Sequence, residues 1–246
     1  CGGRIVLEGS ACIDLTTRSS SLHFVPLGRA ASGAPLTSNV RPRTQHYGAS
    51  MKILLIDARQ PVQGMSEGKL NAHIASCIRD HLVGKGHEVR VTEIVDGYDV
   101  EQEVEKHLWA DIIITQSPVY WFGNPWTYKK YVDEVFNAGL LNPRMVANDG
   151  RTRSDLHKQY GTGGLMQGRK YMLSLTWNAP EAAFNDKSQY LFQGKSVDEA
   201  FAFNTANYRF CGVEILPSFS CHDVLKHGVT DKDIERLRRH LDKYIN

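Results

Sequence analysis

The sequence lacks any hydrophobic run long enough to cross a membrane. Its longest apolar stretches, such as residues 111–115 (DIIIT), fall far short of the roughly 18 to 20 residues that a spanning helix needs. An excess of charge of one sign is also missing, because 29 basic residues face 27 acidic residues and leave a formal net charge of +2. That balance is too even for the extended positive surface of a nucleic-acid-binding protein. We therefore expect neither a membrane span nor a nucleic-acid partner.

Paired cysteines are missing as well. The five cysteines are an odd number and include no CxxC pair: Cys1, Cys12, Cys77, Cys211 and Cys221. They fit neither a disulfide framework nor a zinc site. His73, Cys77 and His81 recur every four residues, as metal ligands on a helix would, but Cys77 falls among predicted core residues and no fourth ligand is evident. We predict no metal site and a reducing, cytoplasmic compartment.

Residues 1–50 differ in composition from the rest of the chain. They contain five arginines, no lysine and only two acids, Glu8 and Asp14, which gives this segment a net charge of +3 and leaves −1 for the remainder. The apolar residues of the segment follow neither the helical nor the strand period. We expect residues 1–50 to be a disordered leader, either transit-like or of cloning origin, and residues 51–246 to form one domain.

From residue 51 onward, short apolar runs alternate with segments of helical period. The runs at 52–57, 87–94, 111–116, 171–176 and 213–217 predict five strands, and the segments 69–83, 99–109, 125–136, 197–210 and 231–245 predict five helices. Regular alternation of this kind is typical of a parallel sheet covered on both faces. The predicted fold class is therefore α/β, a doubly wound five-stranded parallel sheet in a three-layer α/β/α arrangement.

The loop after the first predicted strand is a candidate phosphate site, because ligands of open α/β sheets bind beyond the carboxyl ends of strands. This loop, residues 59–68 (RQPVQGMSEG), leads into a helix whose first turn offers free N–H groups. It contains neither the GxGxxG of Rossmann dehydrogenases nor the GxxxxGK[ST] of P-loop kinases. Flavodoxin-like flavin proteins use a phosphate loop without these signatures; alternatively, Ser66 only caps the helix.

Aromatic residues gather in the loop after the third predicted strand. Tyr120, Trp121, Phe122 and Trp126 all fall within residues 117–126 (SPVYWFGNPW). Because loops are usually polar, this cluster indicates either contact with a flat aromatic ring or a hydrophobic cover over the sheet end. The segments 160–164 (YGTGG) and 176–180 (TWNAP), which flank the fourth strand, could bring backbone amides to the edge of an isoalloxazine.

Several longer segments resemble the flavodoxin-like NAD(P)H:quinone reductases of the modulator of drug activity B group and, more distantly, DT-diaphorase. They are LWAD (108–111), SPVYWFGNPWTYKKYVDEVF (117–136), DGRTR (149–153), YGTGGLMQGRKYMLSLTWNAP (160–180) and FCGVEILP (210–217), and they extend across nearly all of residues 51–246. The resemblance implies a flavodoxin-like fold, FAD as the prosthetic group, a homodimer with the flavin near its interface, and NAD(P)H and a quinone as substrates.

The same resemblance assigns cofactor-binding residues by position. The diphosphate and adenosine side of FAD would contact Ser66, Glu67, Gly68, Lys69, Leu70, Asn71, Ala72 and His73. The isoalloxazine would contact Val119, Tyr120, Trp121, Phe122, Tyr160, Thr176, Trp177, Asn178 and Ala179. Asn178 departs from the glycine-rich turn of DT-diaphorase, and the Tyr and His relay of that enzyme has no counterpart that can be placed here. Tyr160 is the candidate catalytic residue, as a proton donor; alternatively, it only packs against the ring edge.

The implied reaction consists of two hydride steps, in which NADPH reduces the flavin and leaves before a quinone takes its place. Arg151, Arg153 and Lys158 would bind the 2′-phosphate of NADPH, or they are solvated loop charges. Three other functions share the fold. They are a one-electron flavodoxin carrier, usually far more acidic than this domain, a flavin-binding regulatory subunit of a potassium efflux system, and an FMN-dependent azo- or nitroreductase.

Overall fold

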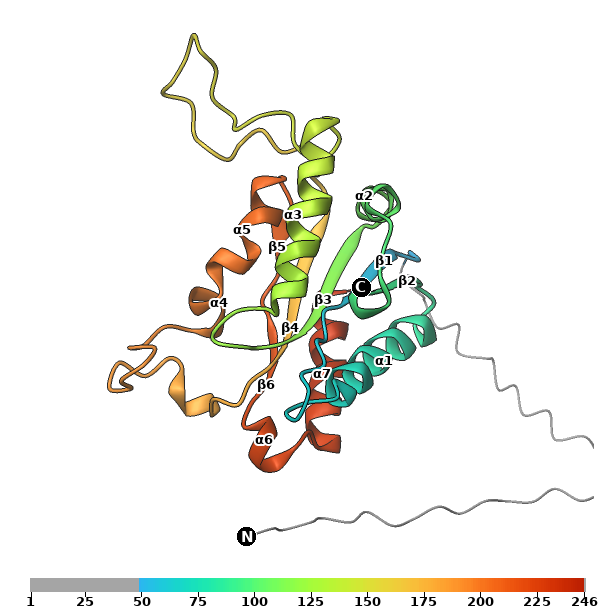
Figure 1. Ribbon diagram of the computed structural model, residues 1–246, viewed down its shortest axis with the longest axis vertical. Coiled ribbons are helices and arrows are strands. Elements are labelled where there is room, and N and C mark those ends of the chain that lie inside the picture. Colours follow the sequence, from blue (N-terminus) through green and yellow to red (C-terminus); the bar gives the residue numbers. More distant parts are fainter. Residues whose placement is uncertain (1–48, 246) are drawn as a thin grey trace, which may run out of the picture. The chain divides into compact units, whose positions relative to one another are not determined.

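The computed structural model describes residues 49–245 (Figure 1), so almost all of the expected leader at 1–50 lies outside the described residues. The strands are β1 (Lys52–Asp57), β2 (Glu88–Glu93), β3 (Ile112–Pro118), β4 (Lys170–Thr176), β5 (Glu214–Ile215) and β6 (Phe219–Cys221). The α-helices are α1 (Lys69–Gly84), α2 (Val100–Trp109), α3 (Trp126–Leu141), α4 (Val197–Ala200), α5 (Ala202–Phe210), α6 (Val224–His227) and α7 (Asp231–Tyr244). Two short 3₁₀ helices, η1 (Ile94–Asp96) and η2 (Glu181–Ala183), complete the elements of this part.

The sheet is parallel and has the strand order β2-β1-β3-β4-β5. Every side chain of β3 is buried, as expected for an interior strand covered on both faces. β6 pairs with β4 farther along the strand than β5 does, so β5 and β6 share the fifth position of the sheet. Pro217 lies between them and has no backbone N–H to donate. The predicted fold class is confirmed, but the predicted strand 213–217 is shorter than expected and β6 was not predicted.

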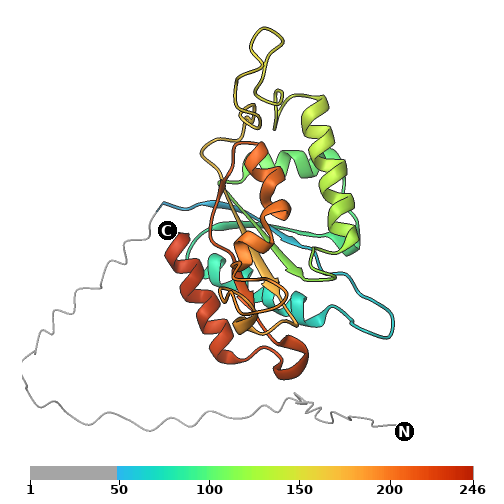
Figure 2. The ribbon, with the colours of Figure 1, turned by 90° about the vertical axis from the view of Figure 1, so that its left-hand side faces the viewer.

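Helices cover both faces of the sheet (Figures 1 and 2). Ile53 and Leu55 of β1 pack into a core cluster with residues of α1 and α7, whereas Leu54 and Ile56 pack into a second cluster with residues of α2, α3 and α5. This alternation is the two-residue period of a strand. Burial of each such side chain contributes roughly 1.5 to 3 kcal/mol, so β1 is anchored from both sides.

Packing of one side chain interrupts a predicted helix. The predicted helix 197–210 is divided into α4 and α5 at Phe201, whose backbone leaves helical geometry (φ −105°, ψ 13°). The Phe201 ring is buried and makes an edge contact with Trp177, with 5.1 Å between the ring centroids. A core contact formed in three dimensions thus overrides the helical periodicity of the sequence.

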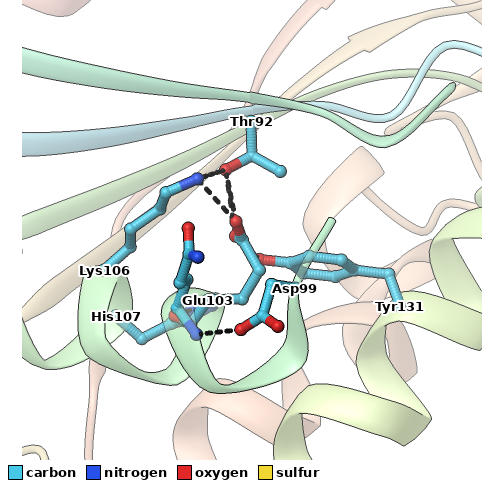
Figure 3. A network of polar contacts seen from close by, with 7 residues as sticks. Thr92, Asp99, Glu103, Lys106, His107 and Tyr131 are labelled. Atoms are coloured by element: carbon cyan, nitrogen blue, oxygen red, sulfur yellow. Dashed lines mark hydrogen bonds and ion pairs between the residues drawn. The ribbon is translucent and has the colours of Figure 1, made fainter. Parts of the chain in front are cut away.

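A buried carboxylate joins three elements on the α2 side of the sheet (Figure 3). Glu103 of α2 is 1% exposed and accepts hydrogen bonds from the Thr92 hydroxyl in β2 (2.9 Å), from Lys106 (2.6 Å) and from the Tyr131 hydroxyl in α3 (2.7 Å). A buried charge is tolerated only when it is paired and hydrogen-bonded, and this one is both. Removal of any of the three partners would leave Glu103 with an unmatched buried oxygen, so the network holds α2 in place between β2 and α3.

His107 of α2 is completely buried next to this network. Its Nδ1 donates to the backbone carbonyl of Glu103 at 2.8 Å, because a carbonyl can only accept. Its Nε2 lies 3.3 Å from the Tyr208 hydroxyl and accepts from it in that tautomer. Burial lowers the pKa of His107 to about 4, so the imidazole is neutral in the folded protein at neutral pH.

The free energy of unfolding should therefore decrease as the pH falls from about 6.5 towards about 4. In this range an unfolded chain, with an ordinary histidine pKa, binds a proton that the folded protein excludes from His107. The expected contribution is roughly 2 to 3 kcal/mol between pH 7 and pH 4. Urea unfolding at several pH values measures it. His107→Gln should show a smaller loss over the same range, and an equal loss in both proteins would contradict the assignment.

Candidate functional site

The loops after β1 and β3 diverge at the carboxyl edge of the sheet. The two strands are neighbours, and the N–H of Ala58 donates to the carbonyl of Gln116 at 2.9 Å where they end. The chain then leaves β1 towards α1 on one face and leaves β3 towards α3 on the other. The reversal of strand order between β1 and β3 opens a crevice, which is where doubly wound sheets bind ligands.

The loop after β1 leads into the start of α1. Gly68 precedes the helix with a left-handed backbone (φ +78°), and the first turn of α1 contains no acidic residue. The hydroxyl of Ser66 accepts the Gly68 N–H at 3.2 Å inside the loop, but α1 begins after Gly68 without a hydrogen bond from a capping side chain, so the capping role considered for Ser66 is not supported. The next N–H groups are those that a helix leaves without an internal partner. Residues 61–67 of the loop line a cavity of about 550 Å³.

The eight residues predicted for the phosphate side have different environments. Glu67 and Lys69 are exposed and form an ion pair with each other. Leu70 packs against the core, so it can offer a ligand its backbone only. Ala72 is half-buried, and His73 is exposed with its Nε2 3.7 Å from the Sγ of Cys77. Ser66 is half-buried, whereas Gly68 and Asn71 are buried.

Asn71 ties the first turn of α1 to the two central strands. Its Oδ1 accepts hydrogen bonds from the Gln116 amide at 2.8 Å and from the Thr176 hydroxyl at 3.2 Å. The Ser174 hydroxyl in turn donates to Gln116 Oε1 at 2.5 Å. All four side chains are buried. Gln116 and Ser174 were not predicted as site residues; the polar ends of two otherwise apolar strands are the feature of the sequence that indicates them.

The aromatic loop after β3 forms a tight turn with an exposed tip. Tyr120 and Gly123 exchange two backbone hydrogen bonds of 2.9 and 3.1 Å, and the two residues between them, Trp121 and Phe122, have positive φ values of 49° and 66°. Asn and Gly usually occupy such positions, and a bulky residue there costs of order 1 to 3 kcal/mol. Trp121 is nevertheless 95% exposed, so its own packing does not offset this cost.

Tyr120 joins the aromatic turn to the loop after β1. Its hydroxyl donates to the backbone carbonyl of Gln60 at 2.9 Å across the crevice. Val119, which precedes it, donates its N–H to the carbonyl of Thr176 at 3.0 Å. The turn is therefore fastened both to the loop after β1 and to β4. Of the four residues predicted for the isoalloxazine wall here, Trp121 and Phe122 present the most exposed rings.

The Trp177 side chain occupies a different place from the one predicted. It is buried in the core and makes edge contacts with Phe184, Phe192 and Phe201, at centroid separations of 5.0, 5.9 and 5.1 Å. The indole therefore anchors the segment after β4 and does not form a wall of the crevice. The backbone of 176–179 still follows the carboxyl end of β4, where Asn178 is exposed.

The segment between β4 and α4 also reaches the aromatic turn. The rings of Phe122 and Phe192 meet edge to face with 6.2 Å between their centroids. Tyr190 and Leu191, next to Phe192 in sequence, are exposed. No role was predicted for this segment, because its aromatic residues follow neither the strand period nor the helix period. Contact with Phe122 makes it part of the rim of the site.

Tyr160 lies on an arm that is distant from the crevice within one chain. Residues 142–169 connect α3 to β4, and Figure 1 shows them projecting past the end of α3. α3 begins beside the aromatic turn and contains 16 residues, a length of about 24 Å. Tyr160 lies beyond the far end of α3 and packs against Phe210, with 5.4 Å between the two ring centroids. The structure thus does not bring Tyr160 together with the aromatic turn of the same chain.

The glycines of the YGTGG segment serve the packing of this arm. A Cβ on Gly163 would lie 2.1 Å from the carbonyl oxygen of Asn148, and one on Gly164 would lie 2.1 Å from the carbonyl carbon of Cys211. Both contacts are far too short for any side chain. Backbone hydrogen bonds of 2.9 Å, from Ala147 to Gly163 and from Leu165 to Met145, close the base of the arm. The expectation that these glycines bring amides to a ligand edge has no support within one chain.

Of the basic residues on the arm, Arg151 is already engaged. Its guanidinium bonds to the carboxylate of Asp149 at 2.6 Å and lies 5.2 Å from the centre of the Tyr160 ring. Arg153 and Lys158 are exposed, and neither forms an ion pair within residues 49–245. These two therefore offer free charge to a ligand.

The cysteines of the described range are free thiols. Cys211 and Cys221 are buried, as predicted, and burial raises the pKa of Cys211 to about 12 and that of Cys221 to about 11. Cys77 is only half-buried, less than predicted.

Within residues 49–245, no group of three or more His, Cys, Asp or Glu side chains could hold a metal ion. Nor does any helix there have the length and apolar character needed to cross a bilayer.

Unpaired polar atoms border the crevice. Gln60 Oε1, both amide atoms of Asn124 and Thr127 Oγ1 are buried without a hydrogen-bond partner in the described part of the chain. Buried polar groups are usually satisfied, so unpaired ones in these two loops fit a site that receives a polar ligand. Together with the start of α1 and the exposed rings of the aromatic turn, they suit a group with both phosphates and a flat ring, as a flavin nucleotide has.

Trp121→Asn should stabilise the protein by about 1 kcal/mol, because asparagine adopts the left-handed backbone at lower cost and the exposed indole has few contacts to lose. Urea unfolding measures the gain. Trp126→Asn, which changes another exposed tryptophan at a helical position, should bring no gain. If the two variants behaved alike, the turn would not be strained.

Comparison with known proteins agrees with this architecture. The flavodoxin-like fold family model matches residues 51–245. The NADPH:quinone oxidoreductase MdaB of Haemophilus influenzae is 42% identical over 193 residues, covering 78% of this chain and 98% of that protein. An uncharacterised protein of Schizosaccharomyces pombe is also 42% identical, with coverage of 78% and 96%.

Solved structures share the fold at lower identity. A quinone reductase, described as putative, from Klebsiella pneumoniae superposes with a TM-score of 0.60 at 22% identity, covering 79% of this chain and 83% of that one. General stress protein 14 of Treponema denticola, solved in complex with FMN, has a TM-score of 0.50 at 20% identity, with coverage of 79% and 95%. From the family model and the long match at 42% identity, the chain belongs to the flavodoxin-like family that includes the quinone oxidoreductase MdaB.

Proposed function

We propose that this protein is an NADPH:quinone oxidoreductase that uses bound FAD. The observation that carries the proposal is the exposed Trp121–Phe122 turn, held in a strained conformation across the crevice from the start of α1. A related protein with 42% identity is named for this activity, and the match covers 98% of its length. The same fold also occurs with FMN, so the identity of the flavin is a part of the proposal that needs its own test.

The chain's own residues divide the cofactor between two sides of the crevice. The N–H groups at the start of α1, from Gly68 to Asn71, would bind the diphosphate. The rings of Trp121 and Phe122 and the backbone of residues 176–179 would bind the isoalloxazine and exclude water from it. When bound, FAD supplies the ability to take a hydride from NADPH and to deliver two electrons to a quinone. The two substrates would occupy one place in turn.

We further propose a homodimer in which the arm of one subunit completes the site of the other. Tyr160 is too far from the aromatic turn of its own chain, yet the arm and the adjoining end of α3 expose apolar side chains: Leu140, Leu141, Leu156 and Leu165. Exposed apolar patches of this kind mark protein interfaces. Tyr160 of the partner subunit would then be placed to protonate the reduced quinone.

Purified protein should release a yellow chromophore on heating that is identified as FAD, and it should oxidise NADPH when menadione is added. Release of FMN would correct the cofactor and favour the azo- or nitroreductase alternative. A stable radical signal without turnover would favour the electron-carrier alternative. A preparation that stays colourless after incubation with either flavin would refute the proposal. Light scattering of the same sample measures whether it is a dimer.

Arg153→Ala should lower the ratio of kcat/KM for NADPH to kcat/KM for NADH by about tenfold, because one charge-assisted hydrogen bond to the 2′-phosphate is lost. Arg151→Ala is the matched control, since Asp149 already holds that guanidinium. If the ratio is unchanged in Arg153→Ala, this arginine is a solvated loop charge.

We also propose a cytoplasmic location. The free thiols of Cys77, Cys211 and Cys221 are compatible with a reducing compartment. Fractionation of cells that express the full chain tests this directly.

A further inference from the structure

Two carboxylates lie side by side where the first two strands end. Asp57 is the last residue of β1, Glu93 is the last residue of β2, and the two are partners in the parallel register. Like charges at neighbouring positions of a sheet repel each other. Asp57 is also buried, with 1% of its surface exposed, and burial raises the pKa of its carboxyl group. Such a pair needs a cation nearby to be tolerated at neutral pH.

Arg59 supplies that cation. Its guanidinium forms ion pairs with both Asp57 and Glu93, and its backbone N–H donates to Asp57 Oδ1 at 3.0 Å. These contacts oppose the effect of burial on the pKa of Asp57. A planar guanidinium can bridge two carboxylates in a fixed geometry, which an ammonium cannot do equally well. The three side chains therefore form one charge cluster that ties the end of β1 to the end of β2.

The same arginine lies beneath the start of α1. A Cβ built on Gly68 would be 3.2 Å from Arg59 Cδ, closer than most such contacts, so the Arg59 side chain packs directly under the residue that precedes the helix. Arg59 and Gly68 flank the loop that follows β1. Within that loop, Val62 and Ser66 exchange backbone hydrogen bonds of 2.8 and 2.9 Å. The Arg59 side chain thus links one end of the loop to the other.

Resting on the proposed flavin site, we propose that Arg59 is a positioning residue for the phosphate-binding loop and not itself a phosphate ligand. Its guanidinium is held by Asp57 and Glu93, so it cancels the charge of a buried carboxylate that would otherwise repel a phosphate bound above it. By packing under Gly68, it also holds the loop and the first turn of α1 in one arrangement before the ligand binds. Preorganisation of this kind raises affinity by lowering the entropy lost on binding.

The experiment compares Arg59→Gln with Arg79→Gln. Arg59 and Arg79 both line a small cavity of about 130 Å³, and each substitution removes one positive charge. Arg79 differs in that its ion pair is with its exposed neighbour Asp80. Affinities for FAD and for riboflavin, which has no phosphate, are measured by flavin fluorescence, and urea unfolding is measured in parallel. Arg59→Gln should raise the Kd for FAD by about tenfold or more while the Kd for riboflavin changes by less than about twofold. Arg79→Gln should change neither.

A double variant separates positioning from direct phosphate contact. In Asp57→Asn with Arg59→Gln, the buried charge is gone and two amides can still hydrogen-bond, so FAD affinity should recover most of its loss. This variant also keeps the test valid if Arg59→Gln alone does not fold. Failure to recover would mean that Arg59 contacts the phosphate, which overturns the inference.

Two results for the single variant would also overturn the inference. One is an unchanged affinity for FAD in Arg59→Gln, and the other is a loss of affinity by the same factor for FAD and for riboflavin. If the wild type binds no flavin, the proposed function itself is wrong.

Discussion

The arrangement of the site depends on one constraint, the reversal of strand order between β1 and β3. Because the chain turns to opposite faces after these neighbouring strands, the start of α1 and the aromatic turn approach the same crevice from different sides. Neither feature would form a site alone. A helix start binds phosphate weakly in open solvent, and exposed aromatic rings without a facing group are only a hydrophobic patch. The topology turns them into the two sides of one site.

Several features at this edge lower the stability of the fold. Trp121 and Phe122 have left-handed backbones, and buried polar atoms of Asn124 have no partner in the described chain. Strain and unpaired polar groups tend to be retained where binding requires them. The opposite holds away from the edge, where the Glu103 network satisfies a buried carboxylate with three partners (Figure 3). The contrast separates the part of the molecule that serves ligand binding from the part that serves stability.

The site could be predicted only in part from the sequence, as Trp177 and Tyr160 show. The aromatic cluster lies at the carboxyl end of β3, as expected, because a strand and the loop that follows it are contiguous in sequence. Trp177 was expected there for the same reason, but its indole turns inward to Phe184 and Phe201, which are distant in sequence. Tyr160 precedes β4, so within one chain it lies towards the amino-terminal edge of the sheet, opposite the edge that carries the aromatic turn. The length of α3, which runs from the aromatic turn to the arm, separates the two.

The sequence by itself determined the fold class and most of the helices and strands. The apolar runs at 52–57 and 111–116 form buried strands. Such runs can be recognised in the sequence without knowing which distant residues will cover them. Tertiary structure alone decided the division of the fifth strand position, the break at Phe201 and the bridge from Arg59 to Glu93. Each of these depends on residues far apart in sequence, brought together by strand register and core packing, and no local pattern encodes such contacts.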